Sequence, residues 1–298
     1  MHSGHSGPGR NEVAPAAHTP TIRLRRFAAE LRRLRREAGL TKEDVAARTS
    51  INSATLYRVE NALVRPQVRT LLALLDLYAA SEEERERLKE LLKASGRRDG
   101  WLQGFEGTLT DRYATYIGFE EEAASIWNFE ALFVPGLLQT ETYARHVIAG
   151  TLTEASENEI SILVEARMRR QELLKRSKPP KLWFIVDEAA LRRRVGSAEE
   201  HREQLDHLRE LIRSRKVTLQ VIPFDAGVHP GMSGAFVVMM FAKEIGQDVV
   251  YLDSMAGDLF LEEESEVERY RLVFEHLRAA ALSPTASADL IAGIASDV

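Results

Sequence analysis

Four side chains near the start of one short predicted helix have the types that read base edges in DNA: Ser53, Ala54, Tyr57 and Arg58. Serine can donate to or accept from a base edge, alanine can contact a thymine methyl group, and arginine can bind guanine through two parallel hydrogen bonds. A recognition helix places its N-terminal residues in the major groove. This segment therefore predicts readout of a DNA sequence.

The residues around this helix suit contacts with the DNA backbone. Thr41 and Lys42 open the preceding predicted helix, where backbone amides and one ammonium group would bind phosphate. Further phosphate contacts are expected from Asn61, Arg65 and Arg69, and from an arginine-rich helix that comes earlier, which makes affinity strongly salt dependent. The alternatives are that the basic helix is only a solvated face, or that the helices form a bundle used for protein contact.

Helix caps and apolar positions define the elements that must hold these side chains. Thr41 is a predicted N-cap with Asp44 three positions later, an acidic form of the capping box, and Asn52 is predicted to cap the next helix. Two short helices joined by a tight turn form the helix-turn-helix pattern. The core beneath the second helix is predicted to contain Ile51, Leu56 and Val59.

Charge is unevenly spread along the chain. Residues 1–70 contain 13 Lys and Arg against 6 Asp and Glu, a balance of +7. The whole chain is −5, so residues 71–298 carry 27 basic and 39 acidic residues, or −12. A basic N-terminal part on an acidic body indicates that one end meets a polyanion.

Composition divides the chain into three regions. Residues 1–20 have almost no large apolar side chain and are predicted to be a disordered tail. Residues 21–96 are predicted to form an all-α domain of about five helices, and residues 97–298 a mixed α/β regulatory or partner-binding domain. A long helix is expected over residues 156–176. Strands are predicted at 182–186, 217–222, 235–241, 249–252 and 258–262.

Membrane insertion and export are not expected. No apolar run approaches the roughly 20 residues of a membrane helix, and the start of the chain has no apolar core of signal-peptide length. The chain has no cysteine, so it has no disulfide and no thiolate metal site. These features favour a cytoplasmic protein.

Signals for catalysis are weak. The segment 231–235 (GMSGA) is one residue short of the nucleophile elbow that would activate Ser233, and a strand-like run follows it instead of a helix. Asp187 and Glu188 could act as a carboxylate pair at a strand end, although capping a helix is the commoner use. No phosphate-binding glycine loop and no metal-binding histidine spacing occur. We expect no enzyme, no metal and no cofactor.

Large aromatic residues of the second domain allow two interpretations. They could line a pocket for an effector or partner, or they could fill a core. The candidates are Trp101, Trp127, Phe129, Phe133, Tyr143, Trp183 and His229.

The segment GLTKEDVAARTSINSATLYRVENALVRP resembles the xenobiotic-response-element (XRE, or lambda-repressor-like) family of helix-turn-helix regulators. The matching features are Leu40, Thr41, Val45–Ala46, Ile51, Thr55–Leu56, Val59–Asn61 and Arg65–Pro66. Ser50 and Ala62 depart from the pattern, because the family usually has glycine at both positions. We expect Ser50 to adopt a left-handed conformation at a cost of about 1 kcal/mol.

The remainder of the chain is similar to the C-terminal domain of a large actinobacterial group, the WhiJ-like XRE regulators, also described as toxin–antitoxin-like antitoxins. The similar segments include VPGLLQT, DEAALRR and HPGMSGAF. The resemblance implies a DNA-binding transcriptional regulator whose C-terminal domain binds an effector or a small partner protein encoded nearby. It supplies no catalytic residue.

Two functions remain open on the sequence. The first is a sequence-specific regulator that binds double-stranded operator DNA as a homodimer, because one short recognition helix reads too few bases alone. The second is an antitoxin-like interaction protein that sequesters a small partner, with DNA binding serving autoregulation.

Overall fold

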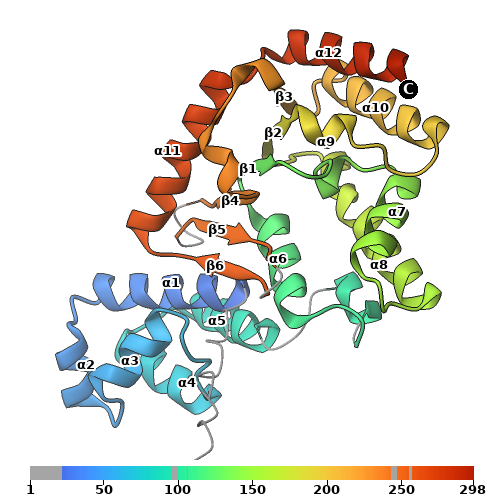
Figure 1. Ribbon diagram of the computed structural model, residues 1–298. Helices are drawn as coiled ribbons and strands as arrows, with labels where there is room; N and C mark the ends of the chain where they lie inside the picture. Colours follow the sequence, from blue (N-terminus) through green and yellow to red (C-terminus); the bar gives the residue numbers. More distant parts are fainter. Residues whose placement is uncertain (1–21, 96–99, 106, 243–246, 255–256) are drawn as a thin grey trace, which may run out of the picture.

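The computed structural model describes residues 22–95, 100–105, 107–242, 247–254 and 257–298 (Figure 1). The predicted disordered tail, residues 1–20, lies outside the described residues, and so does residue 96, where the sequence predicts the helical region to end.

Five helices around one apolar core confirm the predicted all-α region. The first helix buries Phe27, Leu31 and Leu34 along one face, and Gly39 follows its end with a φ of +69°, a conformation that glycine adopts readily. Val68, the first residue of the fourth helix, faces solvent. The helices are α1 (Ile22–Glu37), α2 (Lys42–Arg48), α3 (Ser53–Glu60), α4 (Val68–Leu77) and α5 (Glu82–Ala94).

A six-stranded mixed sheet in the order β3-β2-β1-β4-β5-β6 forms the centre of the second region. Strands β1, β2 and β3 are parallel, whereas β4, β5 and β6 each pair antiparallel with the preceding strand in that order. All five predicted strands are present, and β1 adds a sixth. The strands are β1 (Ser125–Glu130), β2 (Lys181–Asp187), β3 (Thr218–Ile222), β4 (Phe236–Met240), β5 (Val249–Leu252) and β6 (Leu259–Leu261).

Helices cover both faces of this sheet (Figure 1). Neighbouring residues of a strand point to opposite faces, so Phe184 packs in one core while Ile185 packs in the other. One face lies against α11 (Glu264–Ala280), and the other against helices that include α6 (Asp111–Glu122), α10 (Ala198–Arg213) and α12 (Pro284–Asp297). Together with the helical region, this arrangement confirms the predicted fold class.

The other helical elements connect the strands at their ends. The helix predicted over residues 156–176 is divided, because the α-helix ends at Arg170 and a 3₁₀ helix begins at Gln171. The side-chain amide of Gln171 donates a hydrogen bond to the Gln139 carbonyl at 2.6 Å. The remaining elements are α7 (Glu141–Thr151), α8 (Glu157–Arg170), α9 (Glu188–Arg192), and the 3₁₀ helices η1 (Gly100–Phe105), η2 (Gly136–Leu138), η3 (Gln171–Lys175), η4 (Phe224–Ala226) and η5 (Pro230–Ser233).

In the described part of the chain, every helix is too short or too polar to cross a membrane.

Candidate nucleic-acid interface

Side-chain caps fix the start of both motif helices. The Thr41 hydroxyl accepts a hydrogen bond from the Asp44 amide at 3.1 Å, and the Asp44 carboxylate accepts one from the Thr41 amide at 2.9 Å. Asn52 caps α3 by accepting from the Thr55 amide at 2.7 Å. Each cap satisfies amide groups that a helix start leaves without intrahelical partners. The predicted caps are therefore confirmed.

The turn between α2 and α3 is held by Thr49. Its hydroxyl donates to the Val45 carbonyl at 2.7 Å and accepts from the Ile51 amide at 3.1 Å. Ser50 does not have a positive φ, so the expectation of a left-handed Ser50 is wrong. Ala62, the other departure from the XRE pattern, does adopt this conformation, with a φ of +57°.

The inner side of α3 packs into the domain. Leu56 and Val59 are buried, and Ile51 at the turn is buried beside them, as the sequence predicts. Because apolar contacts fix this face, the opposite face of α3 points to solvent.

The outer side of α3 carries the four predicted base-reading residues. Ala54 and Arg58 are exposed, the side chain of Tyr57 is 50% exposed, and Ser53 is half-buried with its hydroxyl 3.5 Å from the Lys42 carbonyl. Within the described residues, the side chain of Arg58 forms no hydrogen bond or ion pair. The Lys42 ammonium lies 4.8 Å from the centroid of the Tyr57 ring, which brings the start of α2 beside this face.

Three of the five predicted phosphate ligands form hydrogen bonds within the domain: Thr41 in the capping box of α2, and Arg65 and Asn61 with other parts of the helical region. The Arg65 guanidinium donates to the Leu92 carbonyl at 3.1 and 2.8 Å. The Asn61 amide donates to the Tyr57 carbonyl at 2.7 Å and accepts from Arg32 at 3.2 Å. These bonds join the end of α3 to α1 and the following loop to α5.

The remaining two predicted phosphate ligands are Lys42, which is half-buried, and Arg69, which is exposed. Thr41 is exposed too, but its hydroxyl and amide bond to Asp44. In the part of the chain that the structure describes, Arg69 has no ion pair.

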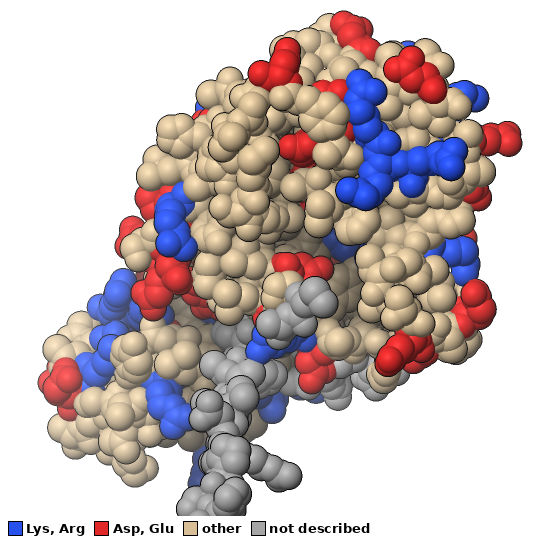
Figure 2. All heavy atoms as spheres, in the orientation of Figure 1, with Lys and Arg blue, Asp and Glu red and all other residues tan. Residues whose placement is uncertain are grey.

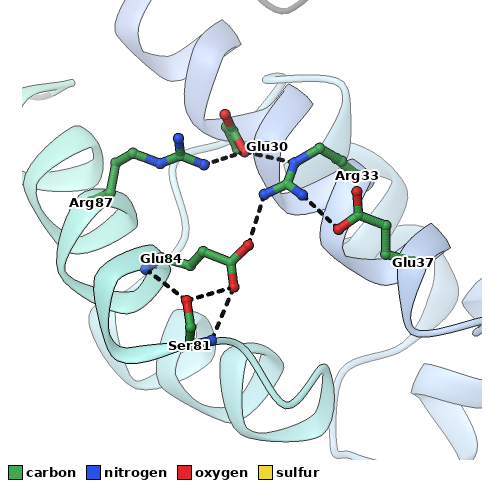
Figure 3. A network of polar contacts seen from close by, with 6 residues as sticks. All are labelled: Glu30, Arg33, Glu37, Ser81, Glu84 and Arg87. Carbon is green, nitrogen blue, oxygen red and sulfur yellow. Dashed lines mark hydrogen bonds and ion pairs between the residues drawn. The ribbon is translucent and has the colours of Figure 1, made fainter.

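The arginines of α1 are largely engaged within the protein, which differs from the expected phosphate-facing helix. Arg33 pairs with Glu30 at 3.1 Å, Glu37 at 2.5 Å and Glu84 at 2.9 Å, while Arg87 of α5 also reaches Glu30 at 2.7 Å (Figure 3). The hydrogen bond from Arg33 is the largest cause that lowers the pKa of Glu84 to about 2. This network joins α1 to α5.

A buried ion pair connects α1 to the end of the recognition helix. Arg35 donates to both carboxylate oxygens of Glu60, at 2.6 and 3.0 Å, and to the Leu40 carbonyl at 2.7 Å. Such a bidentate pair fixes both distance and orientation. The sequence does not predict this pair, because its only sign is a charged residue that follows a buried one on each helix, Arg35 after Leu34 and Glu60 after Val59.

Two family models match these parts of the chain. Residues 26–88 match the family described as Helix-turn-helix domain, and residues 113–293, more than half of the chain, match Domain of unknown function (DUF5753). The chain belongs to the DUF5753 family. No curated protein and no solved structure matches the chain. The helix-turn-helix domain indicates a DNA-binding regulator.

The aromatic candidates of the DUF5753 domain do not line one common pocket, because the sheet separates them. Trp127, Phe129 and Trp183 pack on the α11 side, whereas Trp101, Phe133 and Tyr143 pack on the opposite side. His229 is buried at the edge of the sheet, with its ring centroid 5.9 Å from that of Phe129. Trp101 alone of these residues lines a hollow of about 170 Å³ beside η3.

The two carboxylates after β2 of the DUF5753 domain have structural partners. Asp187 accepts from the Ala189 amide at 2.8 Å, as an N-cap of α9, and lies 3.0 Å from Nε2 of His229. Glu188 accepts from the Phe224 amide at 2.8 Å. Asp187 therefore has the capping use that the sequence favours, whereas Glu188 bonds to the start of the connection after β3.

Ser233 lies at the end of the 3₁₀ helix η5 of the DUF5753 domain and not in a strand-to-helix elbow. Among the described residues, no group of three or more His, Asp or Glu side chains could hold a metal ion.

Proposed function

We propose that this protein is a sequence-specific transcriptional regulator that reads operator DNA through Ser53, Ala54, Tyr57 and Arg58. One observation carries the proposal: Arg58 extends from the exposed face of α3 without a partner in the described chain, while neighbouring arginines are engaged within the protein. An exposed guanidinium on a recognition helix suits bidentate contact with guanine.

Thr41, Lys42 and Arg69 bind phosphate in this proposal and set the position of α3. Lys42 contributes through its charge, beside a helix start at which the Thr41 and Asp44 amides already bond within the capping box. Asn61 and Arg65 act mainly by holding α3 and its following loop in place, through the hydrogen bonds given above.

The protein acts as a homodimer on DNA in this proposal, in the cytoplasm and without a catalytic step. A single recognition helix contacts few base pairs, so two copies on neighbouring half-sites supply the required specificity. The structural roles of Asp187 and Glu188 support a non-catalytic DUF5753 domain.

The DUF5753 domain regulates DNA binding through a small partner protein or an effector. The alternative function is an antitoxin-like protein whose main role is to sequester the partner. Co-purification of a small protein encoded next to this one, at equal stoichiometry and with DNA binding only at its own promoter, would favour that alternative.

The test is quantitative binding to DNA upstream of the protein's own gene at several salt concentrations. Arg58→Ala should weaken specific binding by about 1–3 kcal/mol and relax the preference at one base pair, whereas Lys42→Ala should weaken binding to all sequences and reduce the salt slope by about 1. Arg213→Ala, which changes an exposed arginine of α10, is the matched control. Equal loss over all sequences for Arg58→Ala would make Arg58 a phosphate contact and overturn the base-reading assignment.

A further inference from the structure

The connection between β3 and β4, residues 223–235, runs across the C-terminal ends of the two strands that lie between them, β2 and β1. The parallel strands β1, β2 and β3 end on the same side of the sheet, and the antiparallel strand β4 begins there. The chain from β3 to β4 must therefore pass the ends of β2 and β1. In open α/β sheets, small ligands bind in the crevice outside the carboxyl ends of the strands. Here that position is occupied by the protein's own chain.

Three contacts hold this connection against the sheet. The Phe224 amide donates to Glu188 at 2.8 Å, and His229 lies 3.0 Å from Asp187. Gly231 approaches the Phe129 ring so closely that an added Cβ would lie 2.5 Å from it. The connection is therefore held in place near its start, at Phe224, and in its second half, at His229 and Gly231.

Large apolar side chains point outward from this fixed connection. Phe224 is 57% exposed, Val228 is 91% exposed and Met232 is 63% exposed. Exposed apolar side chains on a rigid segment are unusual for a solvated loop and are typical of binding surfaces, because little conformational entropy is lost when a partner covers them.

A run of three exposed arginines lies beside these apolar residues. Arg192 ends α9, and Arg193 and Arg194 follow it. The Arg192 guanidinium forms an ion pair with Glu188 at 2.6 Å and lies 6.0 Å from the centroid of the Phe224 ring. Arg193 and Arg194 form no ion pair with any residue that the structure describes. Figure 2 shows a group of basic side chains on this side of the domain next to a broad uncharged surface.

We propose that residues 223–235 and Arg192–Arg194 form a docking surface for an acidic protein segment that inserts large apolar side chains. The charge decides the occupant. Residues 71–298 carry a net charge of −12, yet this surface presents Arg193 and Arg194 without an ion pair in the described chain, which selects an acidic partner over a basic one. The inference rests on the proposed regulatory role of the DUF5753 domain and names the surface that receives its partner.

The test is selection of 12-residue peptides from a displayed random library on the immobilised full-length chain. Enriched peptides should combine Asp or Glu with Leu, Phe, Ile or Met. Their affinity should fall at least tenfold in the double variant Val228→Ser/Met232→Ser and in Arg193→Glu/Arg194→Glu. Leu272→Ser on α11, which changes an equally exposed apolar residue, and Arg213→Glu on α10 are the matched controls and should bind as the unmodified chain does.

Enrichment of peptides without acidic residues, or equal binding by the surface variants, would overturn the proposal. A change from dimer to monomer in the Val228→Ser/Met232→Ser variant would assign the surface to a second copy of the chain instead, and loss of DNA affinity in Arg193→Glu/Arg194→Glu would assign it to nucleic acid. DNA binding by the unmodified chain is measured in the same preparations, so failure of the proposed DNA-binding function is recognised separately.

Discussion

Arg25 of α1 forms an ion pair with Glu262, which lies directly after β6, and so joins the helix-turn-helix region to the α/β domain. The guanidinium is also 4.6 Å from the centroid of the Phe119 ring on α6 and donates to the Gln247 carbonyl at 3.2 Å. Arg25 is buried, whereas the neighbouring pair between Arg26 and Glu122, at 3.3 Å, is only partly buried. Arg25 thus contacts the α/β domain through an ion pair, a hydrogen bond and an aromatic ring.

Arg25→Ala should lower the free energy of unfolding of the α/β domain, although Arg25 belongs to the helix-turn-helix region. All three tryptophans, Trp101, Trp127 and Trp183, lie beyond residue 100, so tryptophan fluorescence reports unfolding of the α/β side alone. Because the substitution removes a buried guanidinium and leaves Glu262 without its partner, we expect the free energy of unfolding seen by fluorescence to fall by about 2 kcal/mol.

Arg26→Ala is the matched control for Arg25→Ala. It removes a more solvent-accessible ion pair on the same helix, so its effect on the tryptophan transition should stay below about 0.5 kcal/mol. An unchanged tryptophan transition in Arg25→Ala, together with loss of helical circular dichroism, would show that the two regions unfold independently.

Two alanines after helix ends give a second prediction. Ala79 and Ala62 have φ values of +52° and +57°, and each follows a helix whose last turn closes with the hydrogen bonds of a Schellman motif, such as Ala80 N to Leu75 O at 3.1 Å. Ala79 is exposed, whereas Ala62 is buried in the core of the helical region.

Ala79→Gly should raise the free energy of unfolding by about 0.5–1 kcal/mol, because relief of the left-handed strain exceeds the entropy that glycine adds to the unfolded chain. Ala62→Gly should be near neutral, since it also removes a buried methyl group worth about 0.8 kcal/mol. Chemical denaturation followed by circular dichroism measures both. Equal effects of the two substitutions would contradict this account of why alanine is retained at position 62.

Local signals predicted the helical region well. Thr41 with Asp44, and Asn52 with Thr55, lie three residues apart, so short-range hydrogen bonding alone defines the helix starts. The base-reading face of α3 followed from the same periodicity, since a helix that buries Leu56 must expose the opposite side.

Contacts between residues far apart in the chain could not be predicted from the sequence. Arg35 and Glu60 are 25 residues apart, and nothing in either segment indicates which arginine of α1 meets which carboxylate. The same limit applies to the aromatic residues, because the strand order places Trp183 and Tyr143 on opposite faces of a sheet whose topology the strands themselves do not reveal. The use of α1 arginines in ion pairs, which reduces the basic surface available to DNA, therefore emerged only from the structure.

Glu130 at the end of β1 gives a prediction on pH. Burial, with the nearby charge of Asp253 as the next cause, raises the pKa of Glu130 to about 8 from its usual value of 4.5, against the lowering effects of Asn128, Arg167 and Arg170. Burial also raises the pKa of Asp253. The carboxyl groups of Glu130 and Asp253 lie near each other, so each disfavours the charged form of the other.

A raised carboxyl pKa in the folded state means that the folded protein holds a proton that the unfolded chain has lost. The stability that Glu130 contributes is therefore fully present below about pH 4.5 and is lost as the pH rises to about 8. Glu130→Gln keeps the side-chain shape without the charge. Between pH 5 and pH 8.5, the free energy of unfolding of this variant should rise by about 2 kcal/mol relative to that of the unmodified chain. This is less than the whole pKa shift would give, because Glu130 keeps some contact with solvent. Urea denaturation at a series of pH values measures the difference, and Glu165→Gln, at an exposed position of α8, should leave the pH dependence of the unmodified chain in place. A difference between Glu130→Gln and the unmodified chain that does not change with pH would show that Glu130 is already charged in the folded protein throughout this range.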